Sequence, residues 1–246
     1  MSESAAQPFF EAVYATLQRL QETQSAALRR AAHITADTIV GGGMIHVFGT
    51  GHSHILAEEV FFRAGGLVQI NAILDPGLML HVSALGSIAL ERLEGYANLV
   101  LDRYDLRPGD TMVIVSNSGR NAGPIDAALY AKRRGLPVIA ITSAQAYRNA
   151  EVRHSCGKHL SELADVVIDT GVPEGDASVS LPGLSERIGP LSTIVGAAAI
   201  QAYLYEAVKE VLARGHKPSV VVSANVGSGH DHLSLYDAYK ARIRHW

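Results

Sequence analysis

The stretch that decides the fold reads Met44-Ile45-His46-Val47-Phe48-Gly49-Thr50-Gly51-His52-Ser53-His54. Its first five residues form a short apolar run before a glycine, which is typical of a buried strand in a parallel sheet. A helix is expected from Ser53 to about Ala64. Glycines in the loop between them let the backbone approach a ligand closely, and the start of a helix presents free N–H groups to an anion. The sequence therefore predicts an anion site at Gly51, His52, Ser53 and His54, in which Ser53 either caps the helix or donates its hydroxyl to a phosphate oxygen.

A second loop of the same kind is Ser116-Asn117-Ser118-Gly119-Arg120-Asn121. It separates a predicted strand, Thr111–Val115, from a predicted helix, Pro124–Arg134. An ordinary polar turn is the alternative, but two such loops on one sheet favour a phosphate site. Its expected residues are Ser116, Asn117, Ser118, Gly119 and Asn121.

Two weaker signals of the same type occur later in the chain. Thr142-Ser143 follows the predicted strand Pro137–Ile141, and Ser192-Thr193 lies near the start of a predicted helix from Pro190 to about Ala213. Each pair alone is more typical of a helix cap than of a ligand site. We include Ser192 and Thr193 among the expected substrate-binding residues.

Strands alternate with helices along the chain, which indicates an α/β fold with a doubly wound, flavodoxin-like parallel sheet of about five strands. The remaining expected strands are Val68–Ile70, Asp165–Asp169 and, less clearly, Ser219–Ser223; helices are expected at Ala89–Leu101 and Gly157–Leu163, and loops at 71–88 and 171–189. Residues 8–40 have helical periodicity throughout and predict one added N-terminal helix. We expect a single domain over 1–246, with a core at 41–213 and a C-terminal extension at 214–246. Ligands bind beyond the carboxyl ends of the strands in such sheets.

The composition is that of an ordinary globular protein. The chain has 246 residues, 48% of them hydrophobic, and a formal charge of −3, so neither nucleic acid nor an anionic membrane is expected as a partner. One cysteine, Cys156, excludes an internal disulfide framework and suits a cytoplasmic location. No secretory signal or membrane-spanning run is expected.

The two loops together resemble the sugar isomerase (SIS) domain, over roughly residues 40–210. The strings Gly-Thr-Gly-His-Ser-His, Arg-Ala-Gly-Gly-Leu, Ser-Asn-Ser-Gly-Arg-Asn and Ser-Ala-Asn-Val resemble a stand-alone bacterial SIS family related to phosphoheptose isomerase and arabinose 5-phosphate isomerase. The resemblance implies that Ser53, Ser116, Ser118 and Asn121 contact a phosphosugar, with Ser192 or Thr193 nearby. It also implies a homodimer with sites near the interface.

The sequence departs from both named isomerases. His52 and Arg120 stand where arabinose 5-phosphate isomerases have lysine and glutamate, and Arg63 stands where phosphoheptose isomerases have a catalytic glutamate. The resemblance therefore indicates the class of ligand more specifically than a reaction.

Isomerisation of an aldose to a ketose through an enediol needs a base at the carbons and an acid at the oxygens. Glu59 follows Ser53 by six residues on the predicted helix, so it is our first candidate base, and Glu91 is the second. His81 is the candidate helper at the oxygens, by analogy with the family. The alternative for each glutamate is an ion pair at the surface, and the alternative for the histidine is a structural role.

Metal binding is a competing use of the histidines. His52-Ser53-His54 and His230-Asp231-His232 are short His-x-His units, and imidazole is a common zinc ligand. Neither has the spacing of a known zinc motif, so no cofactor is expected, with zinc as the alternative.

Two classes of function remain. The first is an enzyme, a sugar-phosphate isomerase acting through an enediol. The second is a non-catalytic module that senses a sugar phosphate. A sensor usually carries an effector domain, for which this chain has no spare length, so the isomerase is favoured.

Overall fold

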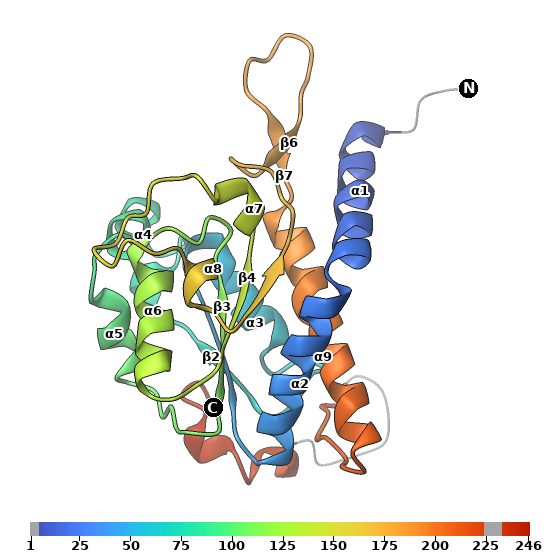
Figure 1. Cartoon of the computed structure of the whole chain (residues 1–246), viewed down its shortest axis with the longest axis vertical. Helices are drawn as coiled ribbons and strands as arrows, with labels where there is room; N and C mark the ends of the chain where they lie inside the picture. The colour runs from blue at the N-terminus through green and yellow to red at the C-terminus, as the bar shows by residue number, and fades with distance from the viewer. Residues whose placement is uncertain (1–4, 224–232) are drawn as a thin grey trace.

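The computed structural model describes residues 5–223 and 233–246. A parallel sheet of five strands in the order β2-β1-β3-β4-β5 forms its centre (Figure 1), which confirms the predicted α/β class and topology. The strands are β1 (Ile45–Gly49), β2 (Ile70–Ile73), β3 (Thr111–Val115), β4 (Val138–Thr142) and β5 (Val166–Asp169). Every pairing in the sheet is parallel, so the loops that leave the strands meet at one edge.

Side chains along the central strands alternate between two hydrophobic cores. In β3, Val113 and Val115 belong to one core, whereas Met112 and Ile114 belong to the other. This alternation follows from the two-residue period of a strand and explains why the central strands have continuous apolar sequences.

Helices cover both faces of the sheet (Figure 1). The first core contains residues of α1 (Gln7–Thr23), α2 (Ser25–Val40), α3 (Ile55–Val60) and α9 (Ser192–Ala213); the second contains residues of α5 (Tyr96–Leu101), α6 (Ala122–Arg133) and α8 (Leu160–Leu163). Gly196 lets α9 approach α3 closely, since a Cβ there would lie 2.7 Å from a methyl group of Leu56. The remaining helical segments are α4 (Ala84–Glu91), α7 (Ala144–Tyr147) and the 3-10 turns η1 (Gly51–His54), η2 (Pro76–Leu78), η3 (Ser234–Tyr236) and η4 (Lys240–Arg242).

The single N-terminal helix expected over 8–40 is wrong, because the structure has two helices that meet at Gln24. The Gln24 side chain accepts a hydrogen bond of 3.0 Å from the backbone N–H of Asp169 at the end of β5. The break thus lets α2 pack along α9 while α1 contacts both α9 and β6. This long-range contact leaves no periodicity signal in the local sequence.

Other boundaries differ where the chain turns earlier or later than its periodicity suggests. The helix expected to reach Ala64 ends at Val60, and Phe62 has a positive φ of 46°. The helix expected over 89–101 is two helices separated by Gly95, whose φ is 85°. The strand expected over 68–70 is shifted to β2, and Ser219–Ser223 contributes one bridge, from Val220 to Leu67.

The expected loop over 171–189 contains a β-hairpin. Strands β6 (Ala177–Val179) and β7 (Ile188–Pro190) pair in antiparallel fashion, and the hairpin projects beyond the sheet on the side of α1 (Figure 1). Gly189 contacts α1 closely, because a Cβ there would lie 2.9 Å from the Phe9 ring.

A buried charged cluster binds the C-terminal segment to the amino end of the sheet, opposite the edge where the loops leave the strands. Asp110 bonds the His46 ring at 3.1 Å and the Arg242 guanidinium at 2.5 Å, and it accepts from the N–H groups of Met44 and Arg107. Burial alone would raise the pKa of Asp110, but these four hydrogen bonds outweigh burial and hold the pKa well below its usual range. The carboxylate therefore stabilises the folded state by staying ionised.

Replacing Asp110 by asparagine should lower the free energy of unfolding at pH 7 by about 3 kcal/mol, because it removes the buried carboxylate partner of Arg242 and leaves that charge only its 3.4 Å ion pair with the half-exposed Asp105. The folded-state pKa of Asp110 lies below its unfolded value of about 3.9. Its stabilising effect is therefore complete above roughly pH 5, starts to decline as the pH approaches about 4, and continues to decline until the pH reaches the much lower folded-state pKa. Thermal melts between pH 5 and 3 should show a steeper loss of stability in the wild type than in Asp110→Asn.

The matched control is Asp37→Asn, since Asp37 pairs with Arg214 at the surface with 60% of its side chain exposed. This variant should keep the wild-type pH dependence. Equal slopes for the wild type and Asp110→Asn would contradict the role given to the buried carboxylate.

Candidate ligand-binding site

The first predicted loop turns sharply at the end of β1. Gly51 has a φ of 54°, and the backbone N–H of Ser53 bonds the carbonyl oxygen of Thr50 at 3.0 Å. A Cβ at Gly49 would overlap the backbone of Ser53, so glycine is required where the loop passes over the strand end. The loop continues through the turn η1 into α3, which brings His52 and Ser53 to the carboxyl edge of the sheet.

The second loop is closed by hydrogen bonds within itself and to its neighbours. The buried Ser116 hydroxyl accepts from Gly119 N–H at 3.1 Å, and Gly119 C=O accepts from Leu160 N–H at 2.8 Å. Gly119 has a φ of 59°, and a Cβ there would lie 2.9 Å from the Thr142 hydroxyl. Ser116 therefore shapes the turn, whereas the half-buried Ser118 hydroxyl has no hydrogen-bond partner within residues 5–223 and 233–246.

A pocket of about 280 Å³, part of it open to solvent, lies where these loops meet the start of α9. Its lining combines predicted residues with side chains from the ends of β3, β4 and β5 and from α9: His52, Ser53, Leu56, Val115, Asn117, Ile141, Thr142, Thr170, Ser192, Thr193 and Gly196. None of these side chains is acidic, and none is a lysine or arginine. The pocket thus presents hydroxyl, amide and imidazole groups over an apolar floor.

Two buried polar atoms in the pocket lining lack a hydrogen-bond partner in the described part of the chain. They are the Thr170 hydroxyl and the Asn117 side-chain oxygen. Thr170 is only 4% exposed, and a buried polar group without a partner costs free energy unless a ligand or solvent satisfies it. Both atoms are therefore suited to a polar ligand in the pocket.

Sequence reasoning missed Thr170 as a site residue. It follows directly after β5, in the position that Ser116 occupies after β3. Its signal is therefore a hydroxyl residue one position beyond a predicted strand, the same signal that identified the second loop.

At the start of α9, the two predicted residues have different surroundings. The Asp176 carboxylate accepts from Leu191 N–H at 2.9 Å, Ser192 N–H at 2.7 Å and the Ser192 hydroxyl at 2.6 Å. Asp176 thus caps this helix and engages the hydroxyl hydrogen of Ser192. Thr193 lines the pocket without such a partner in any described segment.

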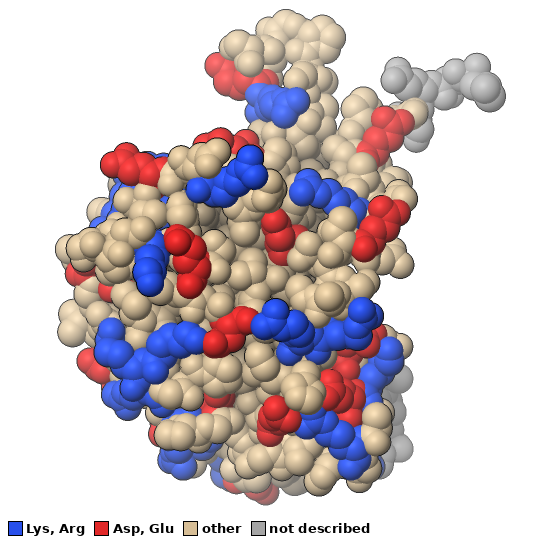
Figure 2. All heavy atoms as spheres, in the orientation of Figure 1, with Lys and Arg blue, Asp and Glu red and all other residues tan. Residues whose placement is uncertain are grey.

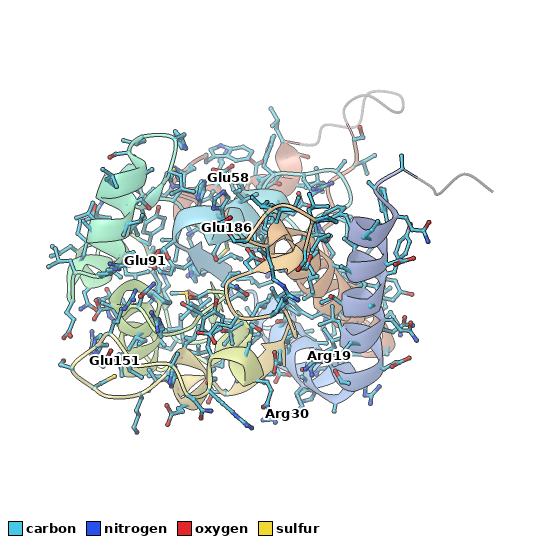
Figure 3. All side chains as sticks on the ribbon, turned by 90° about the horizontal axis from the view of Figure 1, so that it is seen from above. Arg19, Arg30, Glu58, Glu91, Glu151 and Glu186 are labelled. Carbon is cyan, nitrogen blue, oxygen red and sulfur yellow. The ribbon has the colours of Figure 1, made fainter. Side chains whose placement is uncertain are left out.

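Glu91, at the end of α4, joins the two predicted loops. Its carboxylate accepts from the Thr50 hydroxyl at 2.8 Å and from the Asn121 side-chain amide. It also lies beside the first loop, since a Cβ on Gly51 would stand 3.8 Å from Glu91 Oε2. Figure 3 looks onto this end of the molecule and labels Glu91.

Glu59 and His81 have other neighbours. The Glu59 carboxylate pairs with Arg63 and accepts at 3.3 Å from Gln201 on α9. His81 is exposed, with its ring 6.2 Å from the ring of His54. His54 is buried and bonds back to Gly51 C=O, so it supports the loop from within.

Within the described residues, no group of three or more His, Cys, Asp or Glu side chains converges as a metal site. His52 and His54 diverge: His52 is exposed at the pocket and His54 is buried. The second His-x-His unit, at 230–232, lies outside the described residues. Among the described residues, no helix has the length and apolar character needed to cross a bilayer.

Comparison with known proteins agrees with this geometry. The sequence matches the SIS domain over residues 8–143, more than half of the chain. It is 41% identical over 241 residues to a UPF0309 protein of Caldanaerobacter subterraneus subsp. tengcongensis, covering 96% of this chain and 98% of that protein.

The chain belongs to the UPF0309 family of SIS-domain proteins. A UPF0309 protein of Listeria monocytogenes serotype 4b is 41% identical over 228 residues, with 92% of each chain covered. Among solved structures, phosphoheptose isomerase from Neisseria gonorrhoeae superposes with a TM-score of 0.50 at 17% identity, over 83% of this chain and 95% of that one. These findings confirm the predicted family and show that this SIS protein has a phosphosugar-binding fold.

Replacing Thr170 by valine tests whether the Thr170 hydroxyl lacks a hydrogen-bond partner when no ligand is bound. Because the Thr170 hydroxyl is buried without a partner in the described chain, its removal should leave the free energy of unfolding unchanged or raise it by up to about 1 kcal/mol. Chemical denaturation measures this difference.

Thr142→Val is the matched control, since the Thr142 hydroxyl donates to Asn117 C=O at 3.3 Å. That variant should be destabilised by about 1 kcal/mol. If Thr170→Val were destabilised as much as Thr142→Val, the hydroxyl of Thr170 would have a partner in the free protein.

Proposed function

We propose that the chain binds a sugar phosphate with its phosphate group in the pocket. The observation that carries this proposal is the convergence of hydroxyl and amide groups from four strand ends on one pocket: Ser53, Asn117, Thr142 and Thr170. Ser118 does not line the pocket itself but is next to Asn117 in the second loop, with a hydroxyl that has no partner in the described chain. A phosphate needs several hydrogen-bond donors at once, and Ser53, Asn117 and Thr170 can donate, whereas the Thr142 hydroxyl already donates to Asn117 C=O. In this proposal Ser53 and Ser118 have the ligand-contacting role expected from the sequence, whereas Ser116 and Asn121 have a different one and hold the second loop and Glu91 in place.

We further propose that the protein is an isomerase that moves a proton between adjacent sugar carbons through an enediol. Glu91 is the favoured base because Thr50 and Asn121 fix its carboxylate beside both loops. Each oxygen accepts one of these hydrogen bonds and keeps a lone pair for a proton. Exposed His52, at the pocket, and His81 are available as the acid at the sugar oxygens.

Glu59 remains the second candidate for the base. Its ion pair with Arg63 and its contact with Gln201 direct it toward α9, so it would have to leave both partners to reach a sugar. This reverses the order that the sequence suggested.

The homodimer expected from the family is part of the same proposal. Helix α1 exposes Phe10 and Tyr14, with fractions of 47% and 65%. A groove between the helices α1–α2 and α9 has an apolar half, formed by Leu17, Leu20, Leu28, Ala198 and Ala202, and a polar half, formed by Gln21, Ser25, Arg29, Glu206 and Lys209. We propose that a second copy covers this face, since large apolar surfaces are rare on monomers.

Ser118→Ala should weaken sugar-phosphate binding by about 1–3 kcal/mol, the free energy of a hydrogen bond to a charged group. Isothermal titration calorimetry with glucose 6-phosphate and fructose 6-phosphate measures this loss. Unphosphorylated glucose and fructose should bind far more weakly than their phosphates. Equal affinity for a sugar and its phosphate would exclude the pocket as a phosphate site.

Glu91→Gln should reduce turnover by about 10²-fold or more while phosphate binding stays nearly unchanged. The assay is exchange of the proton at C1 or C2 with deuterium, followed by NMR on a sugar phosphate that binds. Glu59→Gln is the matched control and should keep at least a tenth of the wild-type rate. The opposite ranking would restore Glu59 as the base, and binding without exchange in the wild type would favour a sensor.

Light scattering at micromolar concentration should give twice the chain mass of 26.2 kDa. Tyr14→Asp places a charge on the proposed interface and should shift the protein toward the monomer. A monomeric wild type would remove the dimer from the proposal without affecting the phosphate site.

A further inference from the structure

Three arginines gather beside the Glu91–Asn121 pair from three separate segments of the chain. Arg92 follows Glu91 at the end of α4, Arg120 lies in the second loop, and Arg153 lies in the connection between α7 and α8. Each arginine is a chain neighbour or a bonded partner of a residue at the candidate site.

Backbone contacts fix Arg153 against the second loop. Its N–H donates to Arg120 C=O at 2.8 Å, and residues 121 and 153 form an isolated parallel bridge. The Arg153 guanidinium donates to the Asn121 side-chain oxygen at 3.3 Å, while the amide nitrogen of the same Asn121 donates to Glu91. A continuous chain of hydrogen bonds therefore runs from Thr50 through Glu91 and Asn121 to Arg153.

These guanidinium groups have no carboxylate partner within the described residues. Arg92 and Arg120 make no side-chain hydrogen bond or ion pair there, and Arg153 has only the neutral Asn121 amide. Partial burial, followed by the nearby charges of Arg120 and Arg92, lowers the pKa of Arg153; Glu151 and Glu91 oppose this effect. Three like charges are therefore near one another, and within the described residues neither Glu91 nor Glu151 forms an ion pair with any of them.

Elsewhere on the molecule, basic and acidic side chains are mostly interspersed, as the face in Figure 2 shows. Arg103 pairs with Asp75, Arg107 with Asp105 and Arg214 with Asp37. Other arginines of the described chain, such as Arg19 and Arg30, also lack an ion pair. The cluster beside Glu91 differs in that its three arginines are near one another and next to the candidate site.

We infer that the ligand carries a second anionic group, remote from its phosphate, which Arg92, Arg120 and Arg153 bind on the far side of Glu91 and Asn121. This inference rests on the proposed function, because it assumes that the first phosphate occupies the uncharged pocket. Planar guanidinium groups bind carboxylate and phosphate through paired hydrogen bonds, so the second group is either a carboxylate or a second phosphate. The ligand class is therefore a phosphorylated sugar acid or a sugar bisphosphate.

Calorimetric titration of the full chain with two pairs of ligands tests this inference. Fructose 6-phosphate is compared with fructose 1,6-bisphosphate, and glucose 6-phosphate with 6-phosphogluconate. In at least one pair the second anionic group should improve affinity tenfold or more at equal ionic strength. The pair that shows the gain identifies the second group as phosphate or carboxylate.

The double variant Arg120→Gln/Arg153→Gln should reduce that gain to less than threefold while singly phosphorylated sugars bind as before. The matched control is Arg133→Gln, because Arg133 is an exposed arginine of α6 that lacks an ion pair within the described chain and bonds a neutral asparagine side chain, Asn98, as Arg153 bonds Asn121. It should keep the full gain.

Two outcomes would overturn the inference, and they are distinguishable. If the singly phosphorylated sugars bind but the second anionic group gives no gain, or the gain survives in the double variant, the arginines do not bind the ligand and the proposed function stands. If none of the four ligands binds at millimolar concentration, the proposed function fails and this inference fails with it.

Discussion

The loop after β3 turns over the end of β4 at a distance that only glycine permits. Gly119 combines a positive φ of 59° with a position where a Cβ would lie 2.9 Å from the Thr142 hydroxyl, so any other residue is strained and crowded at once. The turn closes on the Ser116 hydroxyl and aligns Asn117 with the pocket and Asn121 with Glu91. The pocket and the Glu91–Asn121 pair therefore both depend on this one close approach.

The pocket and the charged groups of the candidate site are separate. The pocket contains no lysine or arginine, so an anion there would be held by hydroxyl, amide and imidazole donors in a partly closed space, where hydrogen bonds to charge are strong. The charged groups lie outside the pocket lining: two donors fix Glu91 beside the first loop, and Arg153 bonds Asn121, with Arg92 and Arg120 near Arg153. Under the proposed function, a ligand would extend from its phosphate in the pocket toward the Glu91 carboxylate.

Sequence alone predicted what depends on local pattern. The strand Thr111–Val115 has the predicted bounds, because a turn signal precedes it and its apolar run is continuous. Both loops were predicted from glycines and hydroxyl residues next to strands. What depends on distant contacts was not predicted: the break at Gln24 is fixed by Asp169 N–H.

Glu59 was favoured because a helix would place it about 9 Å beyond Ser53 along the axis, but that reasoning could not include Arg63 and Gln201 as its partners. Glu91 becomes the stronger candidate only when α4 folds back against both loops.

The most direct test of the central claim is a crystal structure of the protein grown with a sugar phosphate that binds in solution. The account predicts phosphate density in the pocket, within hydrogen-bond distance of the hydroxyl groups of Ser53, Ser118 and Thr170, with the sugar extending toward Glu91. Phosphate density at any other place, with the pocket occupied only by solvent, would contradict it.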